Sequence, residues 1–572
     1  MNPTDRAAGP PAPPSPKSRQ GPPALGWALG IALPAAALCL LNAAKPLMID
    51  DPAYFAFGRH VAEHPLDPYG FTFFWYQHPV PAFDVLSPPV FNYWLGLGIR
   101  LFGDSPLAAK LWLFPWCLLL TAALATLLRR FALPLAMPLL WMTVLSPAVL
   151  PLMNLMLDVP CLALQLAAVA CFLKARDSNS WSGTVGAGLV AGLAMQTKYT
   201  ALTAPVVLLA AAVLGPSDRN RRSILPGVVA AVVAVTVFAS WEVLTALKYG
   251  ESHFLRHLTR QDTPWVKKLN FVWPFVALVG GVGPAVGFVG LVAWRVPGRW
   301  IAAGMVAFVA GLAVLAYGPR PSSDGPLRAV VFGGSGAITL GLLAATAVVF
   351  ARRYGPVGAR RDDVFLAAWW VIEVAGAFAV SPWPAARRVI GPVVVGTLLA
   401  GRLAAITARS AARVRLIRVV AVFTILLGLF VHAIDIDNAA ADRDGVDRVM
   451  TWVRDNGPDR PVYYVGHLGL QFYAERAGWQ AVDPDHTRLP ARSWLVVPAR
   501  DFGSQRIEIP FGAEFAARIS VDSRWPLTTI PWLHGTNVPL RRQVGPILSL
   551  DVYRVTDDCV PRTPTGGGMA GP

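Results

Sequence analysis

The sequence predicts an α-helical protein that crosses a membrane many times. Of its 572 residues, 54% are hydrophobic and only 15% are charged, whereas soluble domains usually carry about 25% charged residues. Several apolar stretches also reach the roughly 20 residues that span a bilayer. This composition excludes an ordinary soluble enzyme and a disordered protein.

The net charge and the cysteines further limit the classes of protein that fit the sequence. The net charge is +16, which in a multi-pass protein indicates basic cytoplasmic loops and contacts with anionic lipid rather than nucleic acid. None of the five cysteines forms a CxxC motif, so neither a disulfide framework nor a zinc site is indicated. Residues 1–24 are rich in Pro, Ala and Gly and predict a disordered cytoplasmic tail before an uncleaved first helix.

About thirteen membrane spans are expected from the apolar stretches. They cover roughly 25–43, 108–128, 133–151, 159–174, 183–197, 200–214, 224–247, 270–293, 300–317, 328–350, 364–380, 389–408 and 416–434.

The loop charges predict the orientation of these spans. Basic clusters follow even-numbered spans, at 129–130, 174–176, 219–222, 295–299, 352–361 and 409–418. Because Lys and Arg concentrate in cytoplasmic loops, the N-terminus is expected inside and everything after residue 435 outside.

Two segments therefore face the outside. The first is the loop 44–107, which contains a helix-like run from Pro52 to Glu63 and an amphipathic, aromatic-rich run from Pro89 to Phe102, both suited to the membrane interface. The second is 438–572. Its alternation of helix and strand patterns indicates a small α/β domain, with helices at Val446–Arg454 and Leu468–Arg476 and strands at Pro461–Val465 and Ser493–Pro498.

The informative residues are charges at the outer membrane boundary, where ionisable groups are costly and usually functional. Asp50 and Asp51 close the first span, Asp158 follows the third, Lys198 follows the fifth, and Arg387 and Arg388 precede the twelfth. If the helices form a bundle, carboxylates from early loops and cations from later loops converge on one face. Cations that hold a phosphate beside a carboxylate that accepts a proton are suited to transfer from a phosphate leaving group. At the membrane surface the natural donor is a lipid phosphate.

The outer loop after span seven adds His253, Arg256, His257 and Arg260, which we expect near the same face. Structural explanations exist for each group. The aspartates could end or cap helices. The arginines could bury their aliphatic stems while their charged ends reach the membrane interface, and the loop could contact lipid headgroups. The two histidines lie four residues apart and could bind metal, but this spacing alone does not indicate a metal site.

The order of short motifs carries a family resemblance. The motifs are MIDDPAY at 48–54, PLDPYGF at 65–71, SPPVFNY at 87–93, LDVP around Asp158, and GLAMQTKY at 192–199, followed by the late Arg pair. Together they resemble glycosyltransferase family 39 of the GT-C superfamily, which includes bacterial relatives of protein O-mannosyltransferases and of the lipid A aminoarabinose transferase. The resemblance spans roughly 25–435, which it implies to be a GT-C transmembrane catalytic domain.

The resemblance also implies roles for individual residues. Asp50 looks like the general base, with Asp51 in place of a glutamate common in relatives and Asp158 as a second acidic position. The cations expected to hold the lipid phosphate are Lys198, Arg387 and Arg388, with Arg256 and Arg260 nearby. Tyr54 and Arg59 match recurrent positions on the first loop helix, and His253 and His257 are placed beside the site.

Metal and cofactor needs follow from the same resemblance. Some relatives bind a divalent metal with Glu and His, but the first outer loop contains only Glu63, which leaves the metal open. A polyprenyl-phosphate sugar already carries its leaving group, so no cofactor is expected to be required.

The expected function is a membrane glycosyltransferase that moves a sugar, with inversion, from a polyprenyl-phosphate-linked donor to a protein, lipid or glycan acceptor outside a bacterial cell membrane. An oligosaccharyltransferase or an arabinofuranosyltransferase would use a similar donor. The alternative from another class is a transporter or flippase for a lipid-linked or anionic substrate, although the charges gather at the outer boundary rather than at the midplane typical of transporters. A sensor or scaffold with an outer ligand-binding domain is a third reading.

Overall fold

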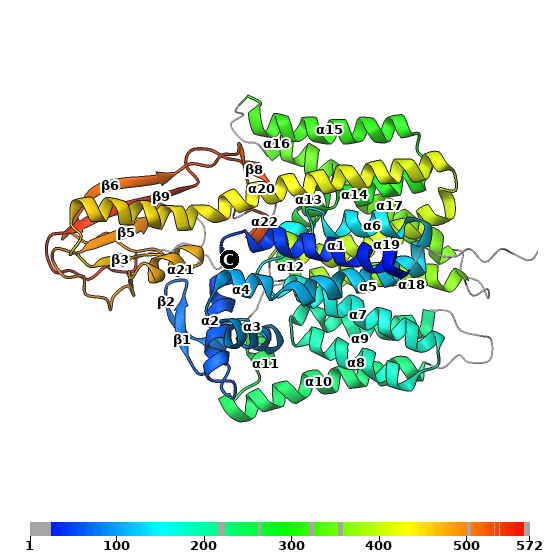
Figure 1. Ribbon diagram of the computed structural model, residues 1–572, viewed down its shortest axis with the longest axis horizontal. Helices are drawn as coiled ribbons and strands as arrows, with labels where there is room; N and C mark the ends of the chain where they lie inside the picture. Colours follow the sequence, from blue (N-terminus) through cyan, green and yellow to red (C-terminus); the bar gives the residue numbers. More distant parts are fainter. Residues whose placement is uncertain are drawn as a thin grey trace, which may run out of the picture.

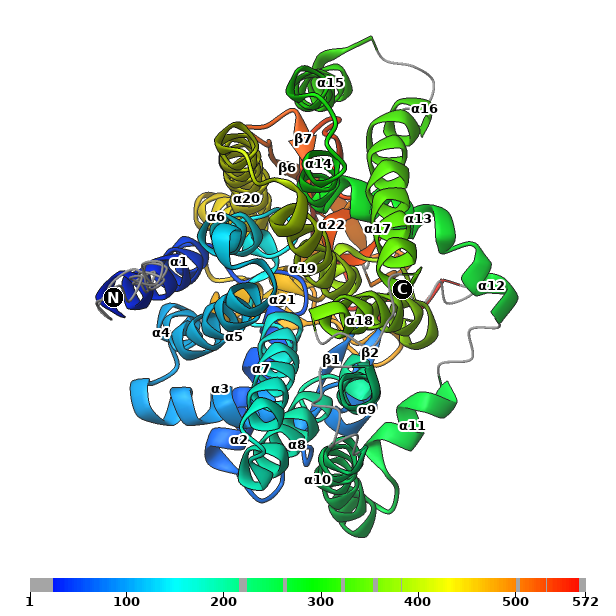
Figure 2. The same cartoon turned by 90° about the vertical axis from the view of Figure 1, so that its right-hand side faces the viewer.

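The computed structural model describes residues 24–214, 224–260, 265–319, 325–352, 359–381, 383–499, 505–530, 532–536 and 538–564. Most of them form a bundle of helices, and a small mixed sheet lies beyond one end of this bundle (Figure 1). Seen along the helices, α7 and α19 lie inside the bundle while α1, α10 and α15 lie at its edge (Figure 2).

The helices are α1 (Ala24–Ala43), α2 (Asp51–Glu63), α3 (Pro89–Phe102), α4 (Pro106–Leu111), α5 (Phe114–Ala132), α6 (Ala136–Val144), α7 (Asp158–Asp177), α8 (Trp181–Met195), α9 (Ala204–Leu214), α10 (Leu225–Tyr249), α11 (His253–Arg260), α12 (Trp265–Leu269), α13 (Val272–Val282), α14 (Pro284–Ala293), α15 (Gly298–Tyr317), α16 (Gly325–Arg328), α17 (Gly334–Arg352), α18 (Ala359–Val380), α19 (Ile390–Thr407), α20 (Ala411–Asn456), α21 (Gly469–Arg476) and α22 (Trp532–Gly535). The strands are β1 (Thr72–Trp75), β2 (His78–Pro81), β3 (Val462–Tyr464), β4 (Gln480–Ala481), β5 (Trp494–Pro498), β6 (Ala513–Val521), β7 (Leu527–Thr528), β8 (Arg541–Arg542) and β9 (Leu548–Val555).

The chain is a multi-pass membrane protein, although the expected count of about thirteen spans is not confirmed. Within the described ranges, nine helical segments are long and apolar enough to cross a membrane, and the pair α13–α14, bent by 76°, adds a tenth if it is one span. The difference has three sources. Residues 106–144 form one continuous candidate where two were expected, the predicted eighth span is this bent pair, and α8 and the segment Tyr199–Leu214 are shorter than a full span.

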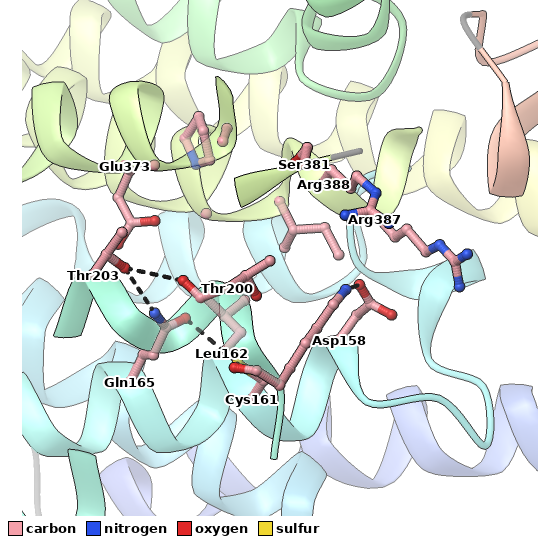
Figure 3. Close-up of a pocket in the computed structure, with 16 residues that line it drawn as sticks. Asp158, Cys161, Leu162, Gln165, Thr200, Thr203, Glu373, Ser381, Arg387 and Arg388 are labelled. Carbon is pink, nitrogen blue, oxygen red and sulfur yellow. Dashed lines mark hydrogen bonds and ion pairs between the residues drawn. The ribbon is translucent and has the colours of Figure 1, made fainter. Parts of the chain in front are cut away.

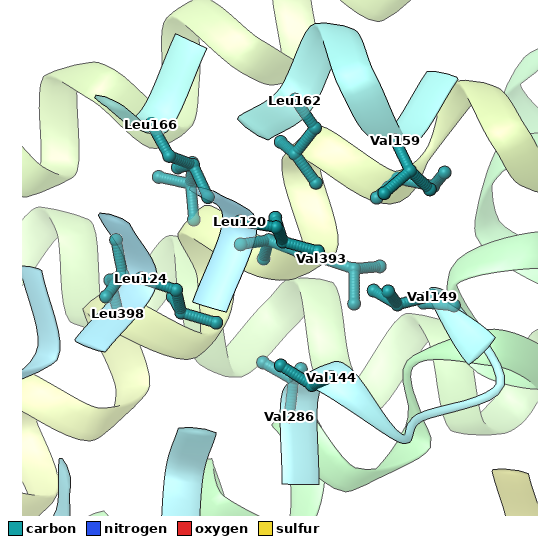
Figure 4. Packing of buried hydrophobic residues seen from close by; sticks show 14 of the residues in the cluster. Leu120, Leu124, Val144, Val149, Val159, Leu162, Leu166, Val286, Val393 and Leu398 are labelled. Atoms are coloured by element: carbon teal, nitrogen blue, oxygen red, sulfur yellow. The ribbon is translucent and has the colours of Figure 1, made fainter. Parts of the chain in front are cut away.

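The packed core of the bundle lies around α7 and α19. Along α7, 83% of the apolar stretch is buried inside the protein, compared with 28% along α15. Leu162 and Leu166 of α7 lie among Leu120 of α5 and Val393 of α19 in this core (Figure 4). The first residues of α7 therefore have little freedom to move, which matters because Asp158 is one of them.

The segment between α1 and α4 forms the two helices expected in the first outer loop and also a hairpin, β1–β2, that the sequence did not indicate. Pro52 and Pro89 stand in the first turns of α2 and α3, where their missing N–H groups cost nothing. The two helices cross closely at Gly58 and Gly96, since a Cβ on Gly96 would lie 3.1 Å from the carbonyl oxygen of Gly58. This contact fixes the direction of α2 and the position of its N-terminal end.

The C-terminal part contains a five-stranded sheet with the order β4-β3-β5-β9-β6, parallel between β3 and its two neighbours and antiparallel elsewhere. Helix α20 continues without a break from the bundle onto this sheet (Figure 1), so the expected helix at 446–454 is its last part. The expected strands near 461–465 and 493–498 appear as β3 and β5, and the helix between them appears as α21.

The C-terminal part also contacts the first outer loop. The Gln77 amide donates to the carbonyl of Arg506 at 2.6 Å, and the rings of Phe55 and Phe472 meet edge to face at 5.8 Å. Both segments therefore lie at the same end of the bundle. Arg130, near the end of α5, pairs with Asp177 at the end of α7 and with Asp362 in α18. These ion pairs connect basic loops that the sequence predicted to lie together on the cytoplasmic side.

Candidate active site

A cavity of about 390 Å³ lies between the first outer loop and the end of the bundle. Its wall comes from segments far apart in the sequence: the start of α2, the hairpin β1–β2, the first turn of α7, the residues after α8, and the loop before α19. The polar groups lining it include Asp50, Tyr54, Asp158, Lys198, Arg387 and Arg388. With His257, which also lines it, the cavity brings together seven of the residues selected from the sequence.

Asp50 lies immediately before α2, and its side chain makes no hydrogen bond that would cap this helix. Its carboxylate instead accepts from Nη1 of Arg387 at 2.7 Å. The side chain is 16% exposed, and that of Arg387 is 11% exposed. The carboxylate is therefore turned toward the cavity rather than used as a helix cap.

Asp158 and Lys198 form a second ion pair in the same wall. Asp158 is the first residue of α7, and Lys198 lies between α8 and η4 (Tyr199–Thr203). Neither the residue before α7 nor the one before η4 caps its helix with a side chain. Figure 3 shows Asp158 at the start of α7 on one side of the pocket and Arg387 and Arg388 together on the opposite side.

The two arginines lie on the short helix η6 (Ala386–Arg388). Burial opposes the charge of Arg387, but the nearby carboxylates of Asp50 and Asp158 outweigh it and raise the pKa of Arg387. For Arg388, burial and the neighbouring Arg387 lower the pKa to about 9, so the guanidinium is still a cation at neutral pH.

Arg388 differs from the other two cations in its partners. Among the residues that the structure describes, it forms no ion pair, and its guanidinium lies 4.5 Å from the ring centroid of Trp383. Its Nε is buried without a hydrogen-bond acceptor. A partly buried cation with an unused donor attracts an anion, and the planar guanidinium suits phosphate.

Beneath the arginines the cavity continues into a smaller polar pocket of about 50 Å³ (Figure 3). Gln165 donates to the hydroxyl of Thr203 at 3.3 Å, and Glu373 accepts from the Trp369 indole at 3.0 Å. Glu373 was not selected from the sequence because it falls inside a predicted apolar span. An acidic residue at membrane depth was the signal available for it.

The segment that carries Asp50 is held by a buried network. Lys45 pairs with Asp435 of α20 at 2.9 Å, and His534 approaches the other oxygen of Asp435 at 2.9 Å, with all three side chains fully buried. The hydroxyl of Tyr473 accepts from the backbone N–H of Leu47 at 2.9 Å. The network thus fixes residues 45–47, which lead to Asp50.

The same segment contains an uncommon backbone conformation. Ile49 has a φ of 48°, in the left-handed region that a β-branched residue rarely adopts. Asp51 is fully buried, accepts from the N–H of Met48 at 3.3 Å and lies 3.8 Å from Nζ of Lys110. Burial raises the pKa of Asp51. Asp51 therefore supports the turn, and it does not line the cavity.

Several other residues expected at the site lie outside the cavity. Arg59 pairs with Asp104 at 2.7 Å and its side chain is 39% exposed. Arg256 pairs with Asp84 and Glu251 and does not line the cavity, whereas the next residue, His257, does. The side chain of Arg260 lies outside the described residues.

His253 is buried and structural. One ring nitrogen bonds to the hydroxyl of Tyr199 at 2.7 Å and the other lies 3.2 Å from the carbonyl oxygen of Val85. Burial lowers the pKa of His253 to about 3, so the ring is neutral at physiological pH. Both nitrogens are engaged, which leaves none for a metal or substrate.

Aromatic residues that were not selected from the sequence complete the wall, together with a lysine of the charged outer loop after span seven. Trp75 and Tyr76 of the hairpin, Trp383 and Lys268 all line the cavity. The aromatic side chains of the first outer loop had been assigned to the membrane interface. Their concentration beside the acidic pair was the signal for a substrate-binding wall.

No group of three His, Cys, Asp or Glu residues with metal-binding geometry lies among the described residues that line the cavity. Its two carboxylates, Asp50 and Asp158, already pair with Arg387 and Lys198. Glu63 is exposed at the end of α2 and does not line the cavity. In the part of the chain that the structure describes, the one His/Cys/Asp/Glu group with metal-binding geometry lies elsewhere, at His78, Asp483 and His486.

Comparison with known proteins confirms the resemblance drawn from the motifs. The family model described as dolichyl-phosphate-mannose-protein mannosyltransferase matches residues 86–242, which include Asp158 and Lys198. No curated protein sequence matches the chain significantly.

Two solved structures are among those to which the chain is similar. ArnT from Cupriavidus metallidurans bound to undecaprenyl phosphate is 16% identical, with 85% of this chain and 96% of that chain covered and a TM-score of 0.37. The Archaeoglobus fulgidus oligosaccharyltransferase in complex with Zn and sulfate is 14% identical, with 82% and 67% covered and a TM-score of 0.46.

Proposed function

We propose that the protein is a membrane glycosyltransferase that uses a polyprenyl-phosphate-linked sugar as its donor. The observation that carries this proposal is the partly buried Arg388, a cation without an ion-pair partner among the described residues, beside two carboxylates in one cavity. The mannosyltransferase family match over 86–242 supports the same class of chemistry.

The cations hold the donor phosphate. Arg388 supplies unused donors, and Arg387 and Lys198 reach the same space while balancing the carboxylates. A donor phosphodiester carries one negative charge, and the departing polyprenyl phosphate carries up to two. The cluster therefore stabilises the leaving group more strongly than the ground state, which is the condition for catalysis.

Asp50 acts on the acceptor. The oxygen of the acceptor hydroxyl forms a bond to the anomeric carbon, and the bond from that carbon to the phosphate oxygen breaks. Its electron pair leaves with the phosphate, and the hydroxyl proton passes to the Asp50 carboxylate. Attack in line with the leaving phosphate inverts the anomeric configuration. Asp158, held by Lys198, orients the phosphate-binding side of the site.

The site faces outward from a bacterial inner membrane in this proposal. The basic loops support that orientation, and the contacts between the first outer loop and the C-terminal part support a shared side for both. The acceptor is a protein, lipid or glycan that approaches between Tyr54, Tyr76 and Asp50.

Mass spectrometry of lipid extracted from the purified protein tests the proposal. We expect polyprenyl phosphate or its glycosylated form to co-purify with the wild type and to be depleted in Arg388→Ala. An extract that contains only bulk phospholipid at the same level in both proteins would overturn it. Transport of an intact lipid-linked substrate without a new glycosidic bond would favour a flippase.

A further inference from the structure

Three potential metal ligands from distant segments meet outside the catalytic cavity. His78 lies on β2, while Asp483 and His486 lie in the loop after β4. Nδ1 of His78 is 2.7 Å from one carboxylate oxygen of Asp483, and Nδ1 of His486 is 3.4 Å from the other. One ligand atom from each residue lies within 4.8 Å of the other two.

A buried amide aligns the two segments independently of these ligands. Gln505 is 4% exposed, and its Nε2 donates to the carbonyl of Gln77 at 3.0 Å and to that of Val482 at 2.6 Å. These carbonyls belong to the residues directly before His78 and Asp483. The first two ligands are therefore placed by the backbone, and the turn from Asp483 to Thr487, closed by a 2.8 Å backbone hydrogen bond, presents the third.

We propose that His78, Asp483 and His486 bind a divalent transition-metal ion of the zinc type. Two imidazoles and one carboxylate match the nitrogen and oxygen ligands of Zn²⁺, with a fourth position open to water. Bond lengths of about 2.0–2.2 Å place tetrahedral ligands about 3.3–3.6 Å apart. The 3.4 Å separation between His486 and Asp483 already has this value, whereas the 2.7 Å contact between His78 and Asp483 lengthens when an ion enters between them. The His486 side chain is 74% exposed and can rotate toward the ion.

The ion would fasten the hairpin β1–β2 to the C-terminal part. His78 is paired with Trp75 across the hairpin, and Trp75 and Tyr76 line the catalytic cavity. A metal at His78 thus holds one wall of the cavity in place from outside. This inference does not depend on the proposed glycosyl transfer.

Zinc titration of the full-length protein tests the site, with no polyhistidine tag and after removal of bound metal with a chelator. We expect one equivalent of Zn²⁺ to bind, and Co²⁺ to give visible absorption bands typical of a tetrahedral site. Replacing a residue that only hydrogen-bonds to a metal ligand already weakens metal binding by about 10- to 100-fold. Loss of a ligand itself, in His486→Ala or His78→Ala, should therefore weaken binding by at least about 100-fold. His64→Ala, an exposed histidine of the same outer loop, is the control and should bind normally.

Hydrogen exchange supplies a readout separate from catalysis. Zn²⁺ should slow amide exchange in residues 72–81 of the wild type and have no effect there in His486→Ala. Because His486 is largely exposed, its removal should leave folding intact. The proposal is wrong if the wild type binds no zinc, or if His486→Ala and His78→Ala bind it as tightly as the wild type. In that case the cluster is a hydrogen-bonded contact only.

Discussion

Replacement of Arg388 by alanine should weaken donor binding while leaving the fold intact. The side chain is partly buried, forms no ion pair among the described residues and lies over Trp383, so its removal leaves no unpaired carboxylate behind. A hydrogen bond to a charged group contributes about 1.5–3 kcal/mol. One such bond to phosphate corresponds to about 10- to 150-fold in affinity.

The assay is equilibrium binding of radiolabelled undecaprenyl phosphate to the protein in detergent, beside its melting temperature. Arg388→Lys keeps the charge but loses the fork and should show an intermediate affinity. Arg59→Ala is the matched control, because Arg59 is an arginine of the same outer face that pairs with Asp104 away from the cavity. Unchanged affinity in Arg388→Ala, or an equal loss in Arg59→Ala, would refute the assignment of the phosphate site.

The remaining predictions concern topology, support of the catalytic segment and pH. A phosphatase reporter fused to the C-terminus should be active and one fused after Arg361 silent; the reverse pattern would displace the site to the cytoplasm. Asp435→Asn leaves the buried Lys45 without its charged partner, and an uncompensated buried charge is costly. Denaturation should therefore show a free energy of unfolding lower by about 3–5 kcal/mol. An unchanged stability would contradict the role of this ion pair. The pKa of His253 is lowered to about 3 by burial, so between pH 6.5 and 3 the unfolded chain binds a proton that the folded chain does not. Stability should therefore fall with decreasing pH by up to about 1.4 kcal/mol per unit, and a melting series in which His253→Phe shows the same slope as the wild type would argue against it.

The sequence predicted the main polar groups of the cavity because the membrane limits where charges can lie. Asp50, Asp158, Lys198 and the Arg pair were selected as charges at one boundary, and the structure places them in one wall. Their pairing, Asp50 with Arg387 and Asp158 with Lys198, needed the arrangement of the helices.

Helix geometry explains which of the residues predicted on α2 line the cavity. Each residue turns an α-helix by about 100°. Tyr54, four residues after Asp50, returns to nearly the same face and lines the cavity. Arg59, nine residues after Asp50, lies on the opposite face and meets Asp104. This distinction could have been made from the sequence once the helix was assigned.

Other features depend on contacts that no local pattern reveals. Lys45 and Asp435 are 390 residues apart, and the last span was expected to end at 434, one residue before Asp435. The structure extends α20 through this position to Asn456. The strands of the hairpin β1–β2 are short, so no local pattern revealed them. Contacts with the C-terminal part help to fix the register of this hairpin.

The most direct test of the account is transfer of sugar from the lipid donor identified in the purified protein, compared between the wild type, Asp50→Asn and Asp158→Asn. In a single-turnover experiment with saturating donor, the wild type should form a new glycosidic bond with inverted configuration and release polyprenyl phosphate. Asp50→Asn should bind the donor normally and lose transfer by about 100-fold or more, the scale of general-base catalysis. Near-normal transfer by Asp50→Asn together with loss in Asp158→Asn would assign the base to Asp158, and normal transfer by both variants would contradict the mechanism.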